Sequence, residues 1–229
     1  GSDNVETTDA VLARKLARVR KSHAITLEAA RWHTLTTGTQ FNPSGTIGSL
    51  SYFTDFGVTQ KSIDFVLGTA GTEVNEKAEE GIAHIQDNIQ SGEVATGFTC
   101  YCSPEFFGKL IKQAGVKEAF KYYSSTQEIL RNRPGGEGVY RSFYFGNIFY
   151  VEIRGSYNGS RHIPANEAVM VPTGTMDCFK TFFGPANKFD LVNTLGEQTY
   201  AWTYSDAKGE KIEIASESNF LNLLARPQV

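Results

Sequence analysis

The chain has 229 residues, of which 40% are hydrophobic and 21% are charged, and its formal net charge is −3. This length and apolar content suffice for one or two domains with a buried core. The slightly acidic balance excludes a protein drawn to nucleic acid or anionic membranes by its overall charge. Three cysteines do not make a disulfide framework in a chain of this length, and no apolar run has the length that spans a bilayer, so we expect a reducing compartment and no membrane partner.

The first predicted element is a long helix at residues 9–37. This stretch contains no Gly or Pro, is rich in Ala, Leu, Arg and Lys, and is followed by Gly38, a typical helix stop. About 29 residues of helix would extend roughly 43 Å. Its first half is basic, and a solvated face is the plainer interpretation of this charge, with contact to a neighbouring subunit or to DNA as the alternative.

Two short strands are expected next, at residues 41–57 and 63–67. The first stretch is rich in turn formers and aromatic residues, and the second is a short apolar run. The Gly-Thr-Ala-Gly stretch at 68–71 is the most plausible crossing between two domains.

A compact mixed segment follows. Apolar residues spaced by three and four predict a helix from Thr72 to Ser91-Gly92, and residues 94–102 predict a strand that places Cys100 and Cys102 on one face. Ser103 and Pro104 predict a capped helix that Gly115 ends, with a further short helix at 116–123.

The rest of the chain is predicted to be rich in strands. Gly146-Asn147 is a strong two-residue turn signal for a hairpin at 139–154. A short strand at 168–171 is expected to stop at Pro172, and residues 200–204 and 210–215 flank a turn at 206–209 in a second hairpin. An isolated hairpin is only marginally stable, so this tail is expected to return to the long helix.

Several segments in a fixed order carry a family resemblance. They are ATGFTCYCSPEFFGKLIKQAGVKEAF at 95–120, IPANEAVMVPTG at 163–174, KFDLVNTLGEQTYAWTY at 188–204 and IEIASESNFLNLLARPQV at 212–229. Together they resemble the major capsid protein E family of tailed phages and prophages, the relatives of the lambda head shell protein. The resemblance extends from about Asp9 to Pro227.

The resemblance implies an α+β chain with the tailed-phage major capsid fold, which is called Hong Kong 97-like. A peripheral domain, at residues 1–67 and 173–229, would contain the long helix as its spine, and an axial domain at 68–172 would be inserted in it. Members of the family usually have an N-terminal arm and an extended loop before the spine helix. Nothing in this sequence corresponds to either, so we expect the chain to be a fragment.

The implied function is that of a structural subunit of a phage or prophage icosahedral head. Copies of the chain would assemble into hexamers and pentamers that enclose double-stranded DNA, with scaffolding, decoration and portal proteins as further partners. The protein would be made in the bacterial cytoplasm and end in the virion. A decoration or tail component is another possibility, but a decoration protein would normally be smaller.

The resemblance also points to interface residues. The basic, glycine-rich stretch at 131–138 would be the axial loop near a capsomer centre, where Arg131 and Arg133 would meet their symmetry mates. Arg14, Arg18 and Lys21 on the long helix are the other candidate contacts.

No catalytic, cofactor or metal motif emerges from the sequence. The four histidines have no metal-binding spacing, and Gly135-Gly136-Glu137-Gly138 lacks the Lys-Ser/Thr of a phosphate-binding loop. We therefore expect neither enzymatic activity nor a cofactor. The alternative from another class is a soluble α+β hydrolase or transferase, which a deep pocket lined by convergent polar groups would favour.

Overall fold

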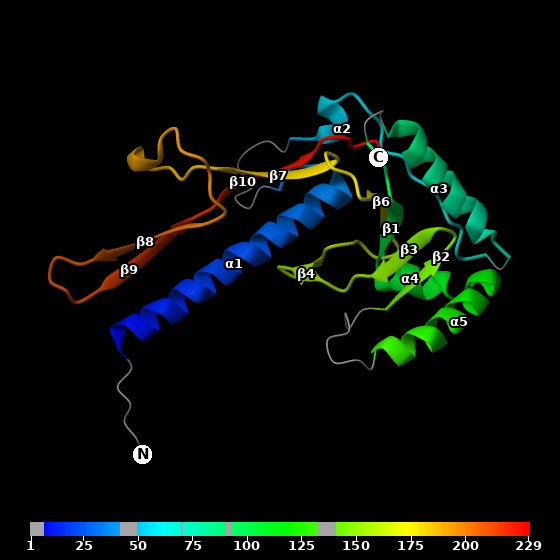
Figure 1. Ribbon diagram of the computed structural model, residues 1–229, viewed down its shortest axis with the longest axis horizontal. Helices are drawn as coiled ribbons and strands as arrows, with labels where there is room; N and C mark the ends of the chain where they lie inside the picture. The colour runs from blue at the N-terminus through cyan, green and yellow to red at the C-terminus, as the bar shows by residue number, and fades with distance from the viewer. Residues whose placement is uncertain (1–6, 42–49, 70, 90–92, 132–140) are drawn as a thin grey trace, which may run out of the picture. The chain divides into compact units, whose positions relative to one another are not determined.

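The computed structural model describes residues 7–41, 50–69, 71–89, 93–131 and 141–229, with the backbone alone at 123–131 (Figure 1). The chain contains both helices and strands, which confirms the α+β class. It divides into two compact units, Gly1–Arg31 with Lys180–Leu223 and Trp32–Phe179 with Leu224–Val229. These units do not share the boundaries expected for the peripheral and axial domains, whose assignment stays a prediction.

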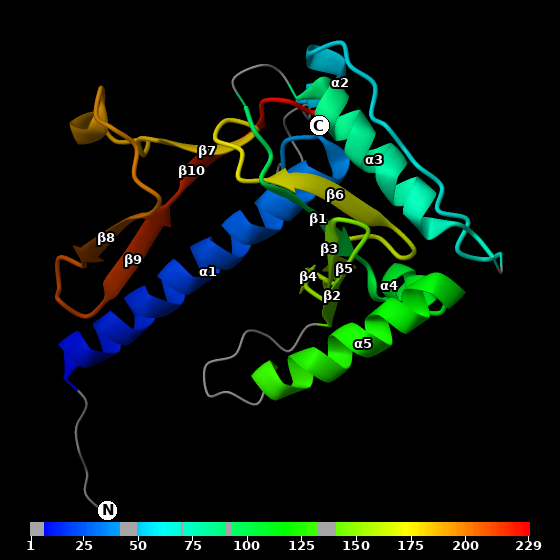
Figure 2. The same ribbon diagram turned by 45° about the vertical axis from the view of Figure 1, so that its right-hand side comes forward.

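The long helix is present as predicted. Helix α1 (Thr8–Thr37) has 30 residues and therefore extends about 45 Å, and Figure 2 shows it unbroken. It ends where Gly38 turns the backbone to a φ of +63° and donates its N–H to the Thr34 carbonyl at 2.9 Å. A Cβ at this position would overlap the ring of Phe53, so both conformation and space require glycine.

The first unit combines most of α1 with two pairs of strands. β7 (Phe179–Gly184) pairs with β10 (Asn219–Leu224), and β8 (Tyr200–Ser205) pairs antiparallel with β9 (Ile212–Glu217) in the predicted hairpin. Hydrogen bonds connect α1 to both pairs: His23 Nε2 lies 3.0 Å from Ser216 Oγ, and Arg31 Nε donates to Thr181 Oγ1 at 3.1 Å. The predicted return of the tail to the long helix is thus confirmed.

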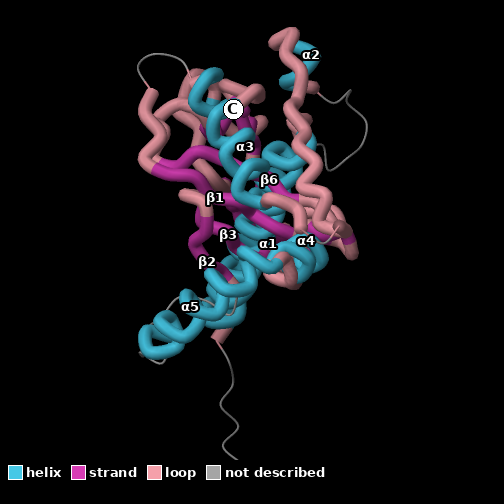
Figure 3. The backbone as a smooth tube through the Cα atoms, turned by 90° about the vertical axis from the view of Figure 1, so that its right-hand side faces the viewer, coloured by secondary structure: helices cyan, strands magenta, loops and turns pink. Residues whose placement is uncertain are grey.

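The second unit is built on a mixed four-stranded sheet of order β2-β3-β1-β6 (Figure 3). β1 (Gly97–Cys102) runs parallel to β3 (Ile148–Glu152) and antiparallel to β6 (Ala168–Thr173), while β2 (Ser142–Phe145) and β3 form the predicted hairpin. Gly146 and Asn147 have φ values of +56° and +62°, as the predicted tight turn requires. A second, small hairpin consists of β4 (Ser156–Tyr157) and β5 (Ser160–Arg161).

Three helices supply the rest of this core. They are α3 (Val74–Asn88), α4 (Pro104–Leu110) and α5 (Ala114–Arg131). The fully buried rings of Phe107 and Phe143 meet edge to face with centroids 5.5 Å apart, and Tyr150 stacks on Phe143 at 5.3 Å. The helix expected after Thr72 and the Ser103 cap, which accepts the Phe106 N–H, are both confirmed.

The two strands expected between 41 and 67 are wrong for the described residues 50–67. That segment contains the short helix α2 (Tyr52–Asp55) and, beside it, only an isolated bridge between Thr39 and Ser51. The apolar run at 63–67 is interrupted by Val66, whose φ is +45° and whose N–H bonds Asp64 Oδ1. Phe65 does not pair in a sheet. Its ring packs edge to face on Phe106, so this apolar side chain contributes to the core without a strand around it.

Two predicted element ends also differ from the structure. Pro172 lies inside β6, opposite Phe98, and does not stop it; β6 is an edge strand, where a residue without an N–H is tolerated. Gly115 lies in the first turn of α5 and does not end α4, and α5 is longer than the helix expected at 116–123.

Candidate functional site

Histidine and cysteine side chains can serve as general bases, nucleophiles or metal ligands. Across the described ranges, no group of three or more His, Cys, Asp or Glu is placed to hold a metal ion. His33 Nε2 lies 3.0 Å from Thr39 Oγ1, and burial lowers the pKa of its ring. His84 Nε2 lies 3.0 Å from the Gln228 carbonyl oxygen. The His33 ring thus contacts a threonine hydroxyl, and the His84 ring contacts a backbone carbonyl.

The cysteines lie in the protein interior. Cys100 and Cys102 point to the same side of β1, as predicted, with their sulfur atoms 3.7 Å apart, and both side chains are buried, as is Cys178. Burial raises the pKa of the Cys102 thiol, and the neighbouring Cys100 and Glu152 raise it further. The Cys102 thiol is therefore protonated at neutral pH and is a poor nucleophile.

A cavity of about 570 Å³ lies in the second unit. Its wall includes Ile63, Phe65 and Met170 together with Lys77 and His84. The His84 ring in this wall bonds a backbone carbonyl and the Asn88 side chain. The contacts of this histidine therefore do not include the serine or cysteine that a hydrolytic site would need.

The predicted contact residues on α1 lie on the surface. Arg14, Arg18 and Lys21 are all exposed. Their spacings of four and three place them along one stripe of the helix. The structure therefore presents these three charges to the same side of α1.

The predicted loop contacts are only partly within the described residues. Arg131 is the last residue of α5 and is described by its backbone, and Arg133 lies in the segment 132–140, outside the described residues. The described chain resumes at Arg141, just before β2. What the structure describes is therefore the base of the predicted loop.

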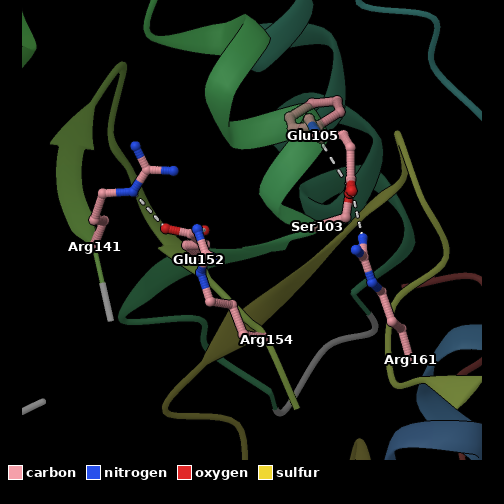
Figure 4. Close-up of polar contacts among 7 residues, drawn as sticks. Ser103, Glu105, Arg141, Glu152, Arg154 and Arg161 are labelled. Carbon is pink, nitrogen blue, oxygen red and sulfur yellow. Dashed lines mark hydrogen bonds and ion pairs between the residues drawn. The ribbon is translucent and has the colours of Figure 1, made fainter. Parts of the chain in front are cut away.

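A charged cluster occupies this base (Figure 4). Glu152, at the end of β3, is 1% exposed, and its Oε2 accepts from Arg141 Nε at 2.5 Å. Arg154 Nη2 lies 2.6 Å from Glu152 Oε1 as a second ion pair. The Arg141 guanidinium also lies over the Phe107 ring at 5.0 Å. One buried carboxylate thus holds two partly exposed arginines.

The electrostatics of the cluster follow from this geometry. Burial alone would raise the pKa of Glu152, but the hydrogen bond and charge of Arg141, together with Arg154, outweigh burial and lower it. The carboxylate is therefore ionised at neutral pH, and it fixes the point at which the chain enters β2.

A third ion pair lies nearby. Glu105 follows the Ser103 cap in the first turn of α4, and its Oε1 accepts from Arg161 Nη1 at 2.5 Å (Figure 4). The hydrogen bond from Arg161 lowers the pKa of Glu105. This contact ties the small β4–β5 hairpin to α4.

Glu152, Arg141 and Arg154 are not among the functional residues that sequence patterns predicted. A signal for them was present, because Ile148, Tyr150 and Glu152 alternate along β3 and all face inward. A carboxylate at an inward position requires a cationic partner. The identity of that partner depends on strand pairing, which places Arg141 beside Glu152.

In the part of the chain that the structure describes, no helix has both the length and the apolar character needed to cross a bilayer.

Comparison with known proteins identifies relatives along the whole chain. The model of the family described as phage major capsid protein E matches residues 1–229. The major capsid protein of Pseudomonas phage KPP10 is 47% identical over 242 residues, which cover 100% of this chain and 69% of the relative. The major capsid protein of Salmonella phage Felix O1 (isolate Felix O1-VT1) is 27% identical over 259 residues, with the same coverage of both chains.

Proposed function

Because the chain belongs to the phage major capsid protein E family, we propose that it is the subunit that closes an icosahedral phage head around double-stranded DNA. The observation that carries the proposal is the match of the family and of a 47% identical major capsid protein along the entire chain. The family's role is structural and not enzymatic. The predicted resemblance to this family is confirmed.

In this proposal the subunits form hexamers and pentamers through contacts that repeat around a ring. A heterologous contact closes into a ring when its rotation closes, and many rings then tile a shell. Scaffolding, decoration and portal proteins would be further partners, and the packaged DNA would be held without sequence-specific contacts. The chain would be synthesised in the host cytoplasm and would end in the virion capsid.

We further propose the Hong Kong 97-like arrangement for this chain. Helix α1 would be the spine of a peripheral domain at 1–67 and 173–229, and residues 68–172 would form the axial domain. The mixed sheet with its α3, α4 and α5 helices supports a separately packed axial domain, since its buried side chains form one cluster. The hydrogen bonds from α1 to β7 and β9 support the tail's place beside the spine.

The proposed ring contact lies at the loop between α5 and β2. Arg131 and Arg133 would meet the neighbouring subunits there, and the Arg141–Glu152–Arg154 cluster would hold the base of the loop. The stripe of Arg14, Arg18 and Lys21 would contact a neighbouring subunit or the DNA. A shell subunit touches several neighbours, so each of these two sets of charged residues would serve a contact of its own.

The double substitution Arg131→Gln and Arg133→Gln in the full-length protein tests the loop contact. We expect closed shells to become at least tenfold rarer in electron micrographs and sedimentation profiles, with the unfolding midpoint of the subunit unchanged. A matched control, K112Q/K117Q, removes the same charge from exposed positions beside and within α5 and should assemble normally. Unchanged assembly of the arginine variant would refute this placement of the contact.

A further inference from the structure

The first unit displays three large apolar side chains within seven residues. They lie in the segment 185–197 between β7 and β8, which we name the apolar loop. The exposed fraction is 98% for Phe189, 63% for Val192 and 94% for Leu195. Single exposed apolar residues are ordinary, but three together form a patch that usually marks a binding surface.

The apolar loop has a defined conformation at its beginning. The short 3-10 helix η1 (Phe189–Leu191) gives it a turn of regular structure. The Asn187 N–H donates to Glu217 Oε1 at 3.0 Å, which anchors the loop to the end of β9. Lys188 Nζ lies over the rings of Trp202 and Tyr204, 5.2 and 5.7 Å from their centroids. This lysine therefore ties the loop to one face of the hairpin.

The end of the apolar loop also makes contacts that fix its backbone. The Tyr200 hydroxyl accepts the Glu197 N–H at 2.8 Å and donates to the Leu195 carbonyl at 3.3 Å. Gly196 lies so close to the Phe183 backbone that a Cβ would overlap it. The three apolar side chains are thus held outward by an ordered loop, and such preorganisation lowers the entropy lost on binding.

A hollow adjoins two of these side chains. It has a volume of about 450 Å³ and is lined by Asn219 and by residues of the same loop, among them Phe189 and Val192. The loop therefore combines a protruding aromatic side chain with a recess beside it. A two-fold contact between identical molecules needs this combination, because each copy must offer the same patch and receive the other's.

We propose that the apolar loop is a two-fold contact, at which the loops of two copies of this chain pack on each other in the assembled head. The inference rests on the proposed function and assigns to it a further surface, separate from the arginines at 131 and 133. Phe189 of each copy would enter the hollow of the other, and Val192 and Leu195 would close around it.

The size of the patch fits a contact that acts together with other contacts of the same subunit. The three side chains offer roughly 400 Å² of apolar surface, whereas a stable pairwise interface needs about 800 Å² from each partner. The contact is therefore too small to hold a dimer alone. It has the size of one of several contacts that a shell subunit makes at once, where many weak contacts add.

Site-directed photocrosslinking tests the proposal directly. A benzoylphenylalanine placed at Phe189 of the full-length protein would be irradiated in purified shells, and the crosslinked peptides would be mapped by mass spectrometry. We expect a species of twice the subunit mass in which position 189 is joined to residues 185–197 of another copy. Crosslinks to another segment, to a different protein, or to nothing would overturn the proposal. The same probe at Met176, which is 85% exposed in the second unit, is the control.

An assembly assay separates this inference from the function on which it rests. The variant F189D/L195D is expected to yield at least tenfold fewer closed shells with an unchanged unfolding midpoint, since both side chains are exposed, while M176D assembles normally. A parent protein that forms no shells with its scaffolding partner would refute the proposed function and the loop contact together. Parent-like shell yields from F189D/L195D would refute the loop contact alone.

Discussion

The buried carboxylate of Glu152 allows a quantitative prediction about the second unit. The substitution Glu152→Gln preserves the shape of the side chain and one acceptor for Arg141, but it removes the charge that two arginines share. A hydrogen bond to a charged group contributes about 1.5–3 kcal/mol and a neutral one about 1 kcal/mol. The arginine side chains are 40% and 62% exposed, so water replaces part of what they lose.

We therefore expect E152Q to lower the free energy of unfolding by about 1–2 kcal/mol at neutral pH. For a protein of this size, this corresponds to a decrease of about 2–8 °C in the melting temperature. The fluorescence of Trp32 can report the loss, because its ring stacks on His162 and meets Tyr101 edge to face within the second unit. The sequence has a second tryptophan, Trp202. Parent and variant would therefore both contain Trp202→Phe, so that the fluorescence comes from Trp32 alone.

The effect should depend on pH with a known sign. The pKa of Glu152 lies below its ordinary value of 4.5 in the folded protein. The charge therefore stabilises the fold fully above about pH 4.5, and this contribution is lost as the pH falls through the folded-state pKa. Because glutamine does not titrate, the difference between parent and E152Q should be greatest near pH 7 and should shrink below about pH 4.5.

Two results would refute this reasoning. One is a parent-like unfolding midpoint for E152Q at neutral pH, and the other is a loss that is as large at about pH 3.5 as at pH 7. Glu80 provides the matched control, because its carboxylate pairs with Lys61 at 2.9 Å but its side chain is 42% exposed. E80Q should change the unfolding midpoint much less than E152Q.

Two further predictions concern backbone and thiol chemistry. Gly57→Ala should destabilise the protein by about 1–2 kcal/mol because its φ is +64°. Gly38→Ala should cost at least about 1 kcal/mol more, because its Cβ also overlaps the Phe53 ring; equal unfolding midpoints for the two variants would contradict the overlap. Because the cysteines are buried, a thiol reagent should react with the native protein only over hours. In denaturant, all three thiols should react immediately. Rapid reaction of any thiol in the native protein would contradict this.

Elements whose signals are local can be predicted from short stretches of the sequence. Helix α1 follows from a stretch without Gly or Pro that ends at a glycine with positive φ. The β2–β3 hairpin follows from Gly146-Asn147, and α4 follows from the Ser103 cap with proline behind it. In each case, the residues that set the conformation are neighbours in the chain, so the free-energy difference is already present in a short segment.

Features that depend on distant partners emerge only when the chain is packed. The apolar run at 63–67 was expected to be a strand, but it packs Phe65 on Phe106, and Pro172 is accommodated in β6 because that strand lies at the sheet edge. Glu152 obtains Arg141 as a partner because β2 pairs with β3. The exposure of Phe189 and Leu195 likewise reflects the loop's attachment to the β8–β9 hairpin. A side chain's partner and its burial are properties of the packed chain, and local sequence does not contain them.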